Sequence, residues 1–200
     1  MRAKRFLLLS IIFFMLFLLT PSFALAASDK YTAVVKKEVK AYFKDIKAYK
    51  PAKIDKHFKT PLKNKYISNP KVQKLIRKMH KHTKYEITSI SIKGNTATVK
   101  VDVAFYDAMD ATKYAYREYL NDCLKTNEYH PENVLKYMKD YYESDYIVLT
   151  DTTFKIPLVK VKGKWKIKKL TSYMYDVLDC GVLKTIDYCG DHPFEVLFGE

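Results

Sequence analysis

The apolar residues at the start of the chain recur with the period of a helix. Between residues 29 and 49 they fall three or four positions apart, at Val35, Val39, Tyr42, Phe43 and Ile46. Such spacing is typical of an amphipathic helix with one buried face. Pro51 ends this helix, a short second helix is expected over residues 54–58, and Asn69-Pro70 is a favourable cap and first position for a third.

The period then changes to two, which indicates strands. Residues 84–106 alternate apolar and polar positions on both sides of Lys93-Gly94-Asn95 and predict a hairpin. A second hairpin is expected over residues 146–170, with Lys162-Gly163-Lys164 as its turn. The parity of the apolar positions changes near Pro157, which predicts a bulge or a bend there.

Helical spacing returns between and after the hairpins. Residues 108–143 show it twice, and residues 171–200 contain the pattern of another short helix. We therefore predict an α+β fold in which a curved antiparallel sheet of about four strands packs on the N-terminal helices. Residues 27–170 are expected to form one domain with a helical insert at 108–143, followed by a C-terminal helical extension over residues 171–200.

This order of elements resembles a known superfamily. Three helices followed by a long antiparallel sheet that ends in VKVKGKWKI at residues 159–167 are similar to the nuclear transport factor 2-like superfamily of cystatin-like α+β proteins. Within it, the chain looks like small exported proteins and lipoproteins of Gram-positive bacteria. The resemblance covers residues 29–170, and the insert and the tail depart from the minimal pattern.

The resemblance implies a pocket. In that superfamily a curved sheet wraps the first helices and encloses a cavity, which serves catalysis in some members and ligand or partner binding in others. We expect four apolar side chains to line it here, namely Phe43, Val101, Phe105 and Trp165. A shared fold does not name a function, so the identity of any ligand is not implied.

The first 26 residues have the order of a secretory leader. Arg2, Lys4 and Arg5 precede an apolar run over residues 6–19, and Ala24-Leu25-Ala26 forms a small-residue site. We expect cleavage before Ala27 and a secreted protein or one at the extracellular surface. The alternative is an uncleaved membrane anchor, but the apolar run falls short of the roughly 20 residues that span a bilayer.

Positive charge is concentrated near the beginning of the chain. The protein has 36 Lys and Arg against 22 Asp and Glu, and residues 27–86 hold 18 of these basic residues and only 5 acidic ones. A lysine stripe is expected along the first helix at Lys36, Lys40 and Lys44. In the final hairpin Lys160, Lys162, Lys164 and Lys166 alternate with apolar residues, which predicts that they share one side.

Two interpretations of these lysines stay open. Their field attracts anionic partners, such as an anionic cell-wall polymer or a phospholipid surface, and salt screens that attraction. Alternatively, lysine protects an edge strand from pairing with other chains and keeps the protein soluble. Nucleic acid is not an expected partner of an exported protein, and the basic helices lack interleaved exposed aromatic residues.

The chain contains few groups with a chemical signature. Cys180 and Cys189 are close enough in sequence for a disulfide, but three buried thiols including Cys123 are an equal alternative. His80-Lys81-His82 is the nearest approach to a metal pair, yet residues two apart on a helix point to opposed sides. The remaining histidines, His57, His130 and His192, are isolated in the sequence.

We find no nucleophile elbow and no metalloprotease or redox motif, so we expect no catalytic residue, no metal and no cofactor. The leading hypothesis is an exported, non-enzymatic binding domain that associates with anionic cell-envelope polymers. One alternative is a small-molecule enzyme that uses a polar group in the sheet pocket. Another is a structural or partner-binding module.

Overall fold

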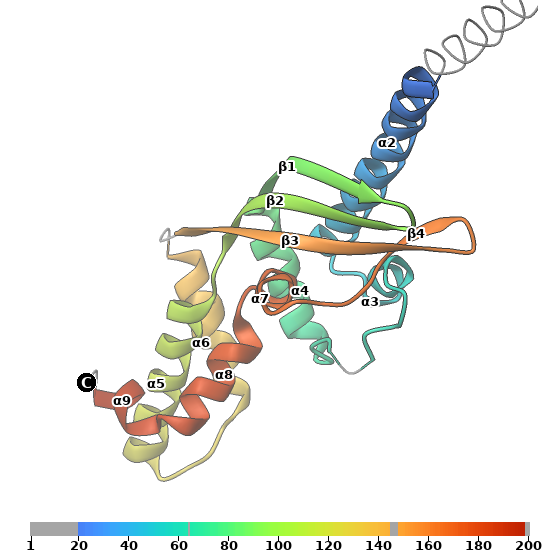
Figure 1. Ribbon diagram of the computed structural model, residues 1–200. Coiled ribbons are helices and arrows are strands. Elements are labelled where there is room, and N and C mark those ends of the chain that lie inside the picture. Colours follow the sequence, from blue (N-terminus) through green and yellow to red (C-terminus); the bar gives the residue numbers. More distant parts are fainter. Residues whose placement is uncertain (1–19, 64, 145–147, 199–200) are drawn as a thin grey trace, which may run out of the picture.

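The structure is a computed structural model, in which residues 20–63, 65–144 and 148–198 are described (Figure 1). Along the chain the elements are α2 (Thr20–Lys47), α3 (Pro51–Ile54), η1 (Asp55–His57), α4 (Pro70–Met79), η2 (His80–His82), β1 (Lys84–Lys93), β2 (Thr96–Tyr106), α5 (Met109–Thr126), α6 (Glu132–Glu143), β3 (Leu149–Val161), β4 (Lys164–Ile167), α7 (Ser172–Asp179), α8 (Val182–Asp191) and α9 (Pro193–Phe198).

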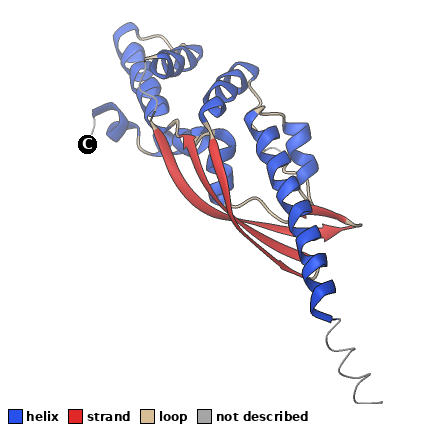
Figure 2. Ribbon diagram, turned by 90° about the horizontal axis from the view of Figure 1, so that it is seen from above, coloured by secondary structure: helices blue, strands red, loops and turns tan. Residues whose placement is uncertain are grey.

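The predicted α+β fold is confirmed. The strands form one antiparallel sheet in the order β1-β2-β3-β4, and Figure 2 shows how strongly they curve. One face of the sheet packs on α2, which supplies the fully buried Val39, Phe43 and Ile46 to the core. The strands contribute their alternating inward residues, such as Val101 of β2 and Ile156 of β3.

Both hairpin turns follow from glycine. Lys162 and Gly163 have φ of 47° and 80°, and two consecutive positive φ values are what a two-residue type I′ turn requires. Gly94 opens the other turn with a φ of 55°. Asn69 also caps α4 as expected, because its side chain accepts hydrogen bonds from the backbone N–H groups of Lys71 and Val72.

The bulge expected near Pro157 is wrong. Pro157 pairs with Thr98 in an uninterrupted β2–β3 ladder, and the register shift lies instead in β1, between Ile87 and Ser89. The backbone N–H of Lys160 points to the β2 side of β3, where it donates to the Asn95 carbonyl. Because backbone N–H directions alternate along a strand, the nitrogen of Pro157, three residues earlier, faces the β4 side. On that side the Pro157 carbonyl accepts the backbone N–H of Lys168 at 2.8 Å, but the proline has no N–H to donate in return, and the β3–β4 ladder ends beside it at Leu158.

The helical insert and the tail come together at one end of the sheet. α5 and α6 pack against each other, and α8 and α9 pack against α5 (Figure 1, lower left). α7 returns to the sheet and adds Met174, Val177 and Leu178 to the main core. The insert and the tail therefore form one helical lobe.

Most of the predicted leader, residues 1–19, lies outside the described residues. Its last part belongs to α2, which begins at Thr20 and contains Ala27. None of the helices in the described ranges is both long and apolar enough to cross a membrane.

Candidate anion-binding surface

The lysines near the start of the chain have no acidic counter-ions. Residues 30–77 contain fifteen Lys and Arg and three acids. Within this stretch, residue 64 excepted, no Lys or Arg forms an ion pair with a described carboxylate. The positive charge of this region is therefore presented without local neutralisation.

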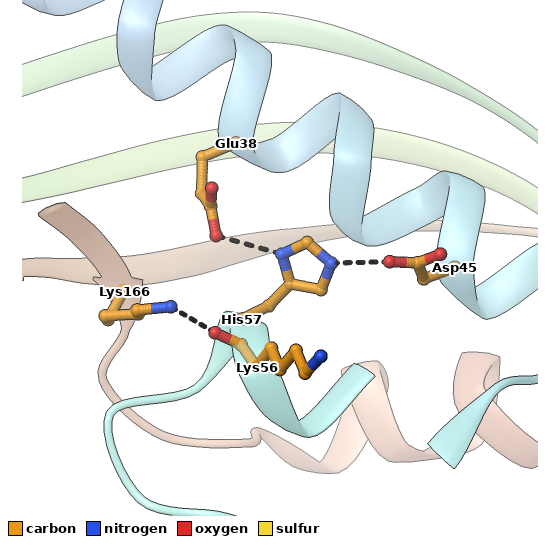
Figure 3. A network of polar contacts seen from close by, with 5 residues as sticks. All are labelled: Glu38, Asp45, Lys56, His57 and Lys166. Carbon is orange, nitrogen blue, oxygen red and sulfur yellow. Dashed lines mark hydrogen bonds and ion pairs between the residues drawn. The ribbon is translucent and has the colours of Figure 1, made fainter. Parts of the chain in front are cut away.

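The three acids are used elsewhere. His57 takes two of them, with its Nδ1 2.9 Å from Glu38 Oε1 and its Nε2 3.0 Å from Asp45 Oδ2 (Figure 3). The third, Asp55, accepts hydrogen bonds from the Tyr66 hydroxyl at 2.6 Å and from the backbone N–H of Leu62 at 3.0 Å. These carboxylates bond to a histidine, a tyrosine and the backbone instead of to lysines.

The helix period explains how two carboxylates reach one imidazole. Glu38 and Asp45 are seven residues apart, so they lie on the same flank of α2 two turns from each other. Pro51 starts the short α3, and the chain then turns back so that η1 places His57 between the two acids (Figure 3).

The surroundings of His57 favour its charged form. The side chain is buried, and burial lowers its pKa, but the hydrogen bonds that His57 donates to Glu38 and Asp45 outweigh burial and leave the pKa raised. A neutral imidazole has one N–H and can donate to one carboxylate only, whereas the imidazolium donates to both. The three groups together then carry a single negative charge.

A second set of contacts holds η1 to the edge of the sheet. Lys166 of β4 donates from its Nζ to the backbone carbonyl of Lys56 (Figure 3), and the backbone N–H of Lys59 donates to the Ile167 carbonyl at 2.8 Å. The free edge of β4 is thereby covered by the segment that carries His57.

The predicted lysines do not form one stripe. Lys36, Lys40 and Lys44 follow one another at one-turn spacing on α2, on the side away from Glu38 and Asp45. All three are exposed. The lysines of the final hairpin belong to other elements, and one of them, Lys166, reaches η1 at the backbone carbonyl of Lys56.

The expectation that the hairpin lysines share one side is wrong. Lys160 is paired with Trp165, and its Nζ lies 4.4 Å from the centre of the Tyr31 ring of α2. Lys164 and Lys166 are paired with Val161 and Val159 on the opposite face, and Lys162 is in the turn. Paired residues of antiparallel strands share a face of the sheet, and the two-residue turn pairs each even-numbered residue of one strand with an odd-numbered residue of the other. Even-numbered lysines before and after the turn therefore lie on opposite faces.

The four residues expected to line a pocket are core residues. Phe43 and Val101 are 0% exposed, and Phe105 and Trp165 are 3% and 4% exposed, all within one packed cluster. The Phe43 ring stacks on Tyr85 with 4.1 Å between the ring centres. Side chains fill the space between the sheet and α2, which corrects the expectation of an open pocket at these residues and leaves the enzyme alternative without a site there.

All three cysteines are free thiols in the structure, and the disulfide considered between Cys180 and Cys189 is not formed there. Both are buried, while Cys123 is partly exposed. Cys180 Sγ lies 3.9 Å from His80 Nδ1. Burial raises the pKa of Cys180 and lowers that of His80 to about 4. The pair is neutral and buried, which is unlike the exposed thiolate of a catalytic cysteine.

The two histidines of the possible metal pair have separate partners. His80 Nε2 donates to the Leu178 carbonyl at 3.0 Å, and His82 Nε2 lies 3.1 Å from the Tyr142 hydroxyl. Within the described ranges, no three His, Cys, Asp or Glu side chains are arranged to hold a metal ion.

Sequence reasoning missed His57. Its partners lie 12 and 19 residues away, and no motif links them. The only available signal was the seven-residue spacing of Glu38 and Asp45, which places two acids on one flank of a helix otherwise rich in lysine.

No protein-family model, curated protein or solved structure matches the chain. The resemblance to the nuclear transport factor 2-like superfamily therefore stays a prediction.

Proposed function

We propose that the protein is an exported, non-enzymatic binding domain that associates with an anionic polymer of the cell envelope. The observation that supports this most directly concerns the fifteen basic residues of 30–77, none of which forms an ion pair with a carboxylate of the described residues. A lysine without a neighbouring carboxylate keeps its full attraction for an external anion.

The stripe on α2 is the part of this surface that suits a polymer best. Lys36, Lys40 and Lys44 are exposed and successive members lie one helical turn apart, about 6 Å along the axis. A flexible chain of repeated phosphates or carboxylates is able to place successive charges along such a row. The acids on the same helix, Glu38 and Asp45, face His57 and do not compete.

The experiment compares two variants of equal net charge. Lys36→Gln/Lys40→Gln/Lys44→Gln removes the stripe, and Lys93→Gln/Lys100→Gln/Lys125→Gln removes three exposed lysines elsewhere. Binding to purified cell walls is measured by sedimentation at increasing salt. We expect the stripe variant to bind about ten-fold more weakly than the control variant, and salt to weaken both.

Three results would contradict the proposal. The first is an equal loss of wall binding in both variants, because net charge alone would then explain the binding. The second is wall binding that high salt leaves unchanged. The third is binding that persists after the anionic polymers, both phosphate- and carboxylate-containing, are extracted from the walls, or binding that is found on anionic phospholipid vesicles alone.

A further inference from the structure

A cavity of about 610 Å³ opens where the first turn of α4 meets α5, α6 and α8. Its size lies within the roughly 300–1,000 Å³ typical of small-molecule sites. Most of its lining is apolar: Val72, Val134, Leu135, Met138, Val182 and Ile186. It is separate from the filled space between the sheet and α2, because it belongs to the helical lobe and to α4.

One polar side chain in the lining lacks a partner. Thr112 of α5 is 2% exposed, and its hydroxyl is buried without a hydrogen bond to any described residue. Helical threonines usually return the hydroxyl to the carbonyl four residues earlier. Thr126 and Thr185 do so here, each at 2.8 Å.

The hydroxyl of Thr112 is therefore available to a ligand. Threonine occupies two χ1 rotamers in helices, and rotation about χ1 changes the direction in which its hydroxyl points. An oxygen of a bound molecule would supply the partner that the protein itself does not provide.

Charge at the cavity favours an anion. Lys71 lines the apolar cavity and also a neighbouring cavity of about 390 Å³, which contains Lys74, Lys78, Lys139 and Glu143. Glu143 is shared by Lys78 at 3.0 Å and Lys139 at 3.5 Å. Lys71 and Lys74 have no described acidic partner.

One acid also lines the apolar cavity. Glu132 lies at the start of α6, where its carboxylate is 3.3 Å from His130 Nδ1. The hydrogen bonds to Glu128 and Glu132 raise the pKa of His130, which favours the imidazolium form beside this carboxylate. The charge left without a partner at the cavity is that of Lys71, with Lys74 beside it.

From these observations we propose that the cavity binds a single-chain anionic amphiphile. The alkyl chain lies against the apolar residues of α4, α6 and α8, and the carboxylate or phosphate head group accepts hydrogen bonds from Lys71 and Thr112. This site is independent of the lysine stripe on α2, since no residue is common to both.

The test titrates the full chain with probes below their micelle concentrations, using isothermal calorimetry. Dodecanoate and dodecyl phosphate carry the proposed head groups, methyl dodecanoate retains the oxygens without the charge, and dodecyltrimethylammonium reverses the charge. We expect one site that binds an anion at least about ten-fold more tightly than the ester and does not bind the cation. The anion that binds more tightly indicates whether the ligand class is a fatty acid or a phosphate amphiphile.

Matched variants locate the site. Lys71→Gln and Thr112→Val are each expected to lower the affinity for the more tightly bound of the two anions by about three- to ten-fold. Their controls are Lys81→Gln in η2, which follows α4, and Thr126→Val at the end of α5, and both should leave the affinity unchanged. Circular dichroism verifies that each variant is folded. The Lys36→Gln/Lys40→Gln/Lys44→Gln variant should also keep its affinity for the amphiphile. Failure of the cavity proposal can therefore be distinguished from failure of the polymer-binding proposal.

A second pair of variants tests the apolar part. Ile186→Asp introduces a carboxylate at the cavity and should abolish binding of every alkyl probe. Leu124→Asp, at an apolar residue that is 73% exposed, should leave binding unchanged. Equal affinity for anion and cation, or unchanged binding in both Lys71→Gln and Ile186→Asp, would overturn the proposal.

Discussion

Gly181 lies directly against Asp107: a Cβ atom at Gly181 would stand 2.7 Å from Asp107 Oδ1. Gly181 separates α7 from α8 and has a φ of 72°, a conformation that other residues adopt only with strain. The Asp107 oxygen also accepts the backbone N–H of Met109 at the start of α5. This close approach joins the beginning of the insert to the junction between α7 and α8 in the tail.

Gly181→Ala is therefore expected to destabilise the protein by about 2 kcal/mol or more, because backbone strain and a clash with Asp107 act together. Urea unfolding measures the change. The control is Gly190→Ala in α8, where a Cβ would contact nothing within 4 Å and alanine should stabilise the helix by about 0.5–1 kcal/mol. Similar stability of Gly181→Ala and the wild type would contradict the close approach.

The ion pairs of His57 predict a loss of stability at high pH. Its folded pKa is raised above the usual histidine value of 6.5, so the stabilisation is fully present below that pH and disappears as the pH rises through the folded pKa. The difference in unfolding free energy between the wild type and His57→Gln should therefore shrink from about pH 5.5 to about pH 9.

His130→Gln is the control for His57, because the contacts of His130 with Glu128 and Glu132 are exposed. Exposed pairs contribute little, and this variant should match the wild type. A stability difference in His57→Gln that is independent of pH would mean that folding does not raise the pKa of this imidazole.

The opposite behaviour is expected of His80 at low pH. Burial lowers its pKa from 6.5 to about 4, so the unfolded chain takes up the proton first. Stability should fall by about 3 kcal/mol as the pH drops from 6.5 to below 4.

The measurement for His80 is the difference between the wild type and His80→Gln across this range. The difference is needed because burial raises the pKa of Asp179 to about 7, which acts in the reverse direction by stabilising the folded state as the pH falls. If His80→Gln and the wild type lose stability in parallel on acidification, His80 is not the group that titrates.

Thiol reactivity tests the free cysteines. Denatured protein, without reductant, should titrate three thiols with a chromogenic disulfide reagent. In the folded protein Cys123 should react first, since it is partly exposed, and burial raises the pKa of both Cys180 and Cys189. A single thiol in the denatured, unreduced protein would instead demonstrate a disulfide.

Much of the fold was predictable from short stretches of sequence. The spacing of Val35, Val39 and Ile46, the cap at Asn69-Pro70 and the two glycine turns each depend on a few neighbouring residues. Their elements were predicted close to their observed positions for that reason. The strand order followed because each hairpin joins neighbours along the chain.

The candidate sites were less predictable because they depend on residues that are distant in sequence. His57 meets Glu38 and Asp45 only because α3 and η1 fold back along α2. The apolar cavity exists only because α4, α5, α6 and α8 meet around it. No local period contains that information.

Local spacing thus establishes which segments become helices, strands and turns, since the backbone period and the steric demands of glycine and proline act over a few residues. The placement of charge required the assembled molecule. Hairpin register separated Lys160 from Lys164, and α2 directed its acids to His57 and away from Lys36. Register and packing join residues far apart in the chain, and they decide which charges are neutralised and which face solvent.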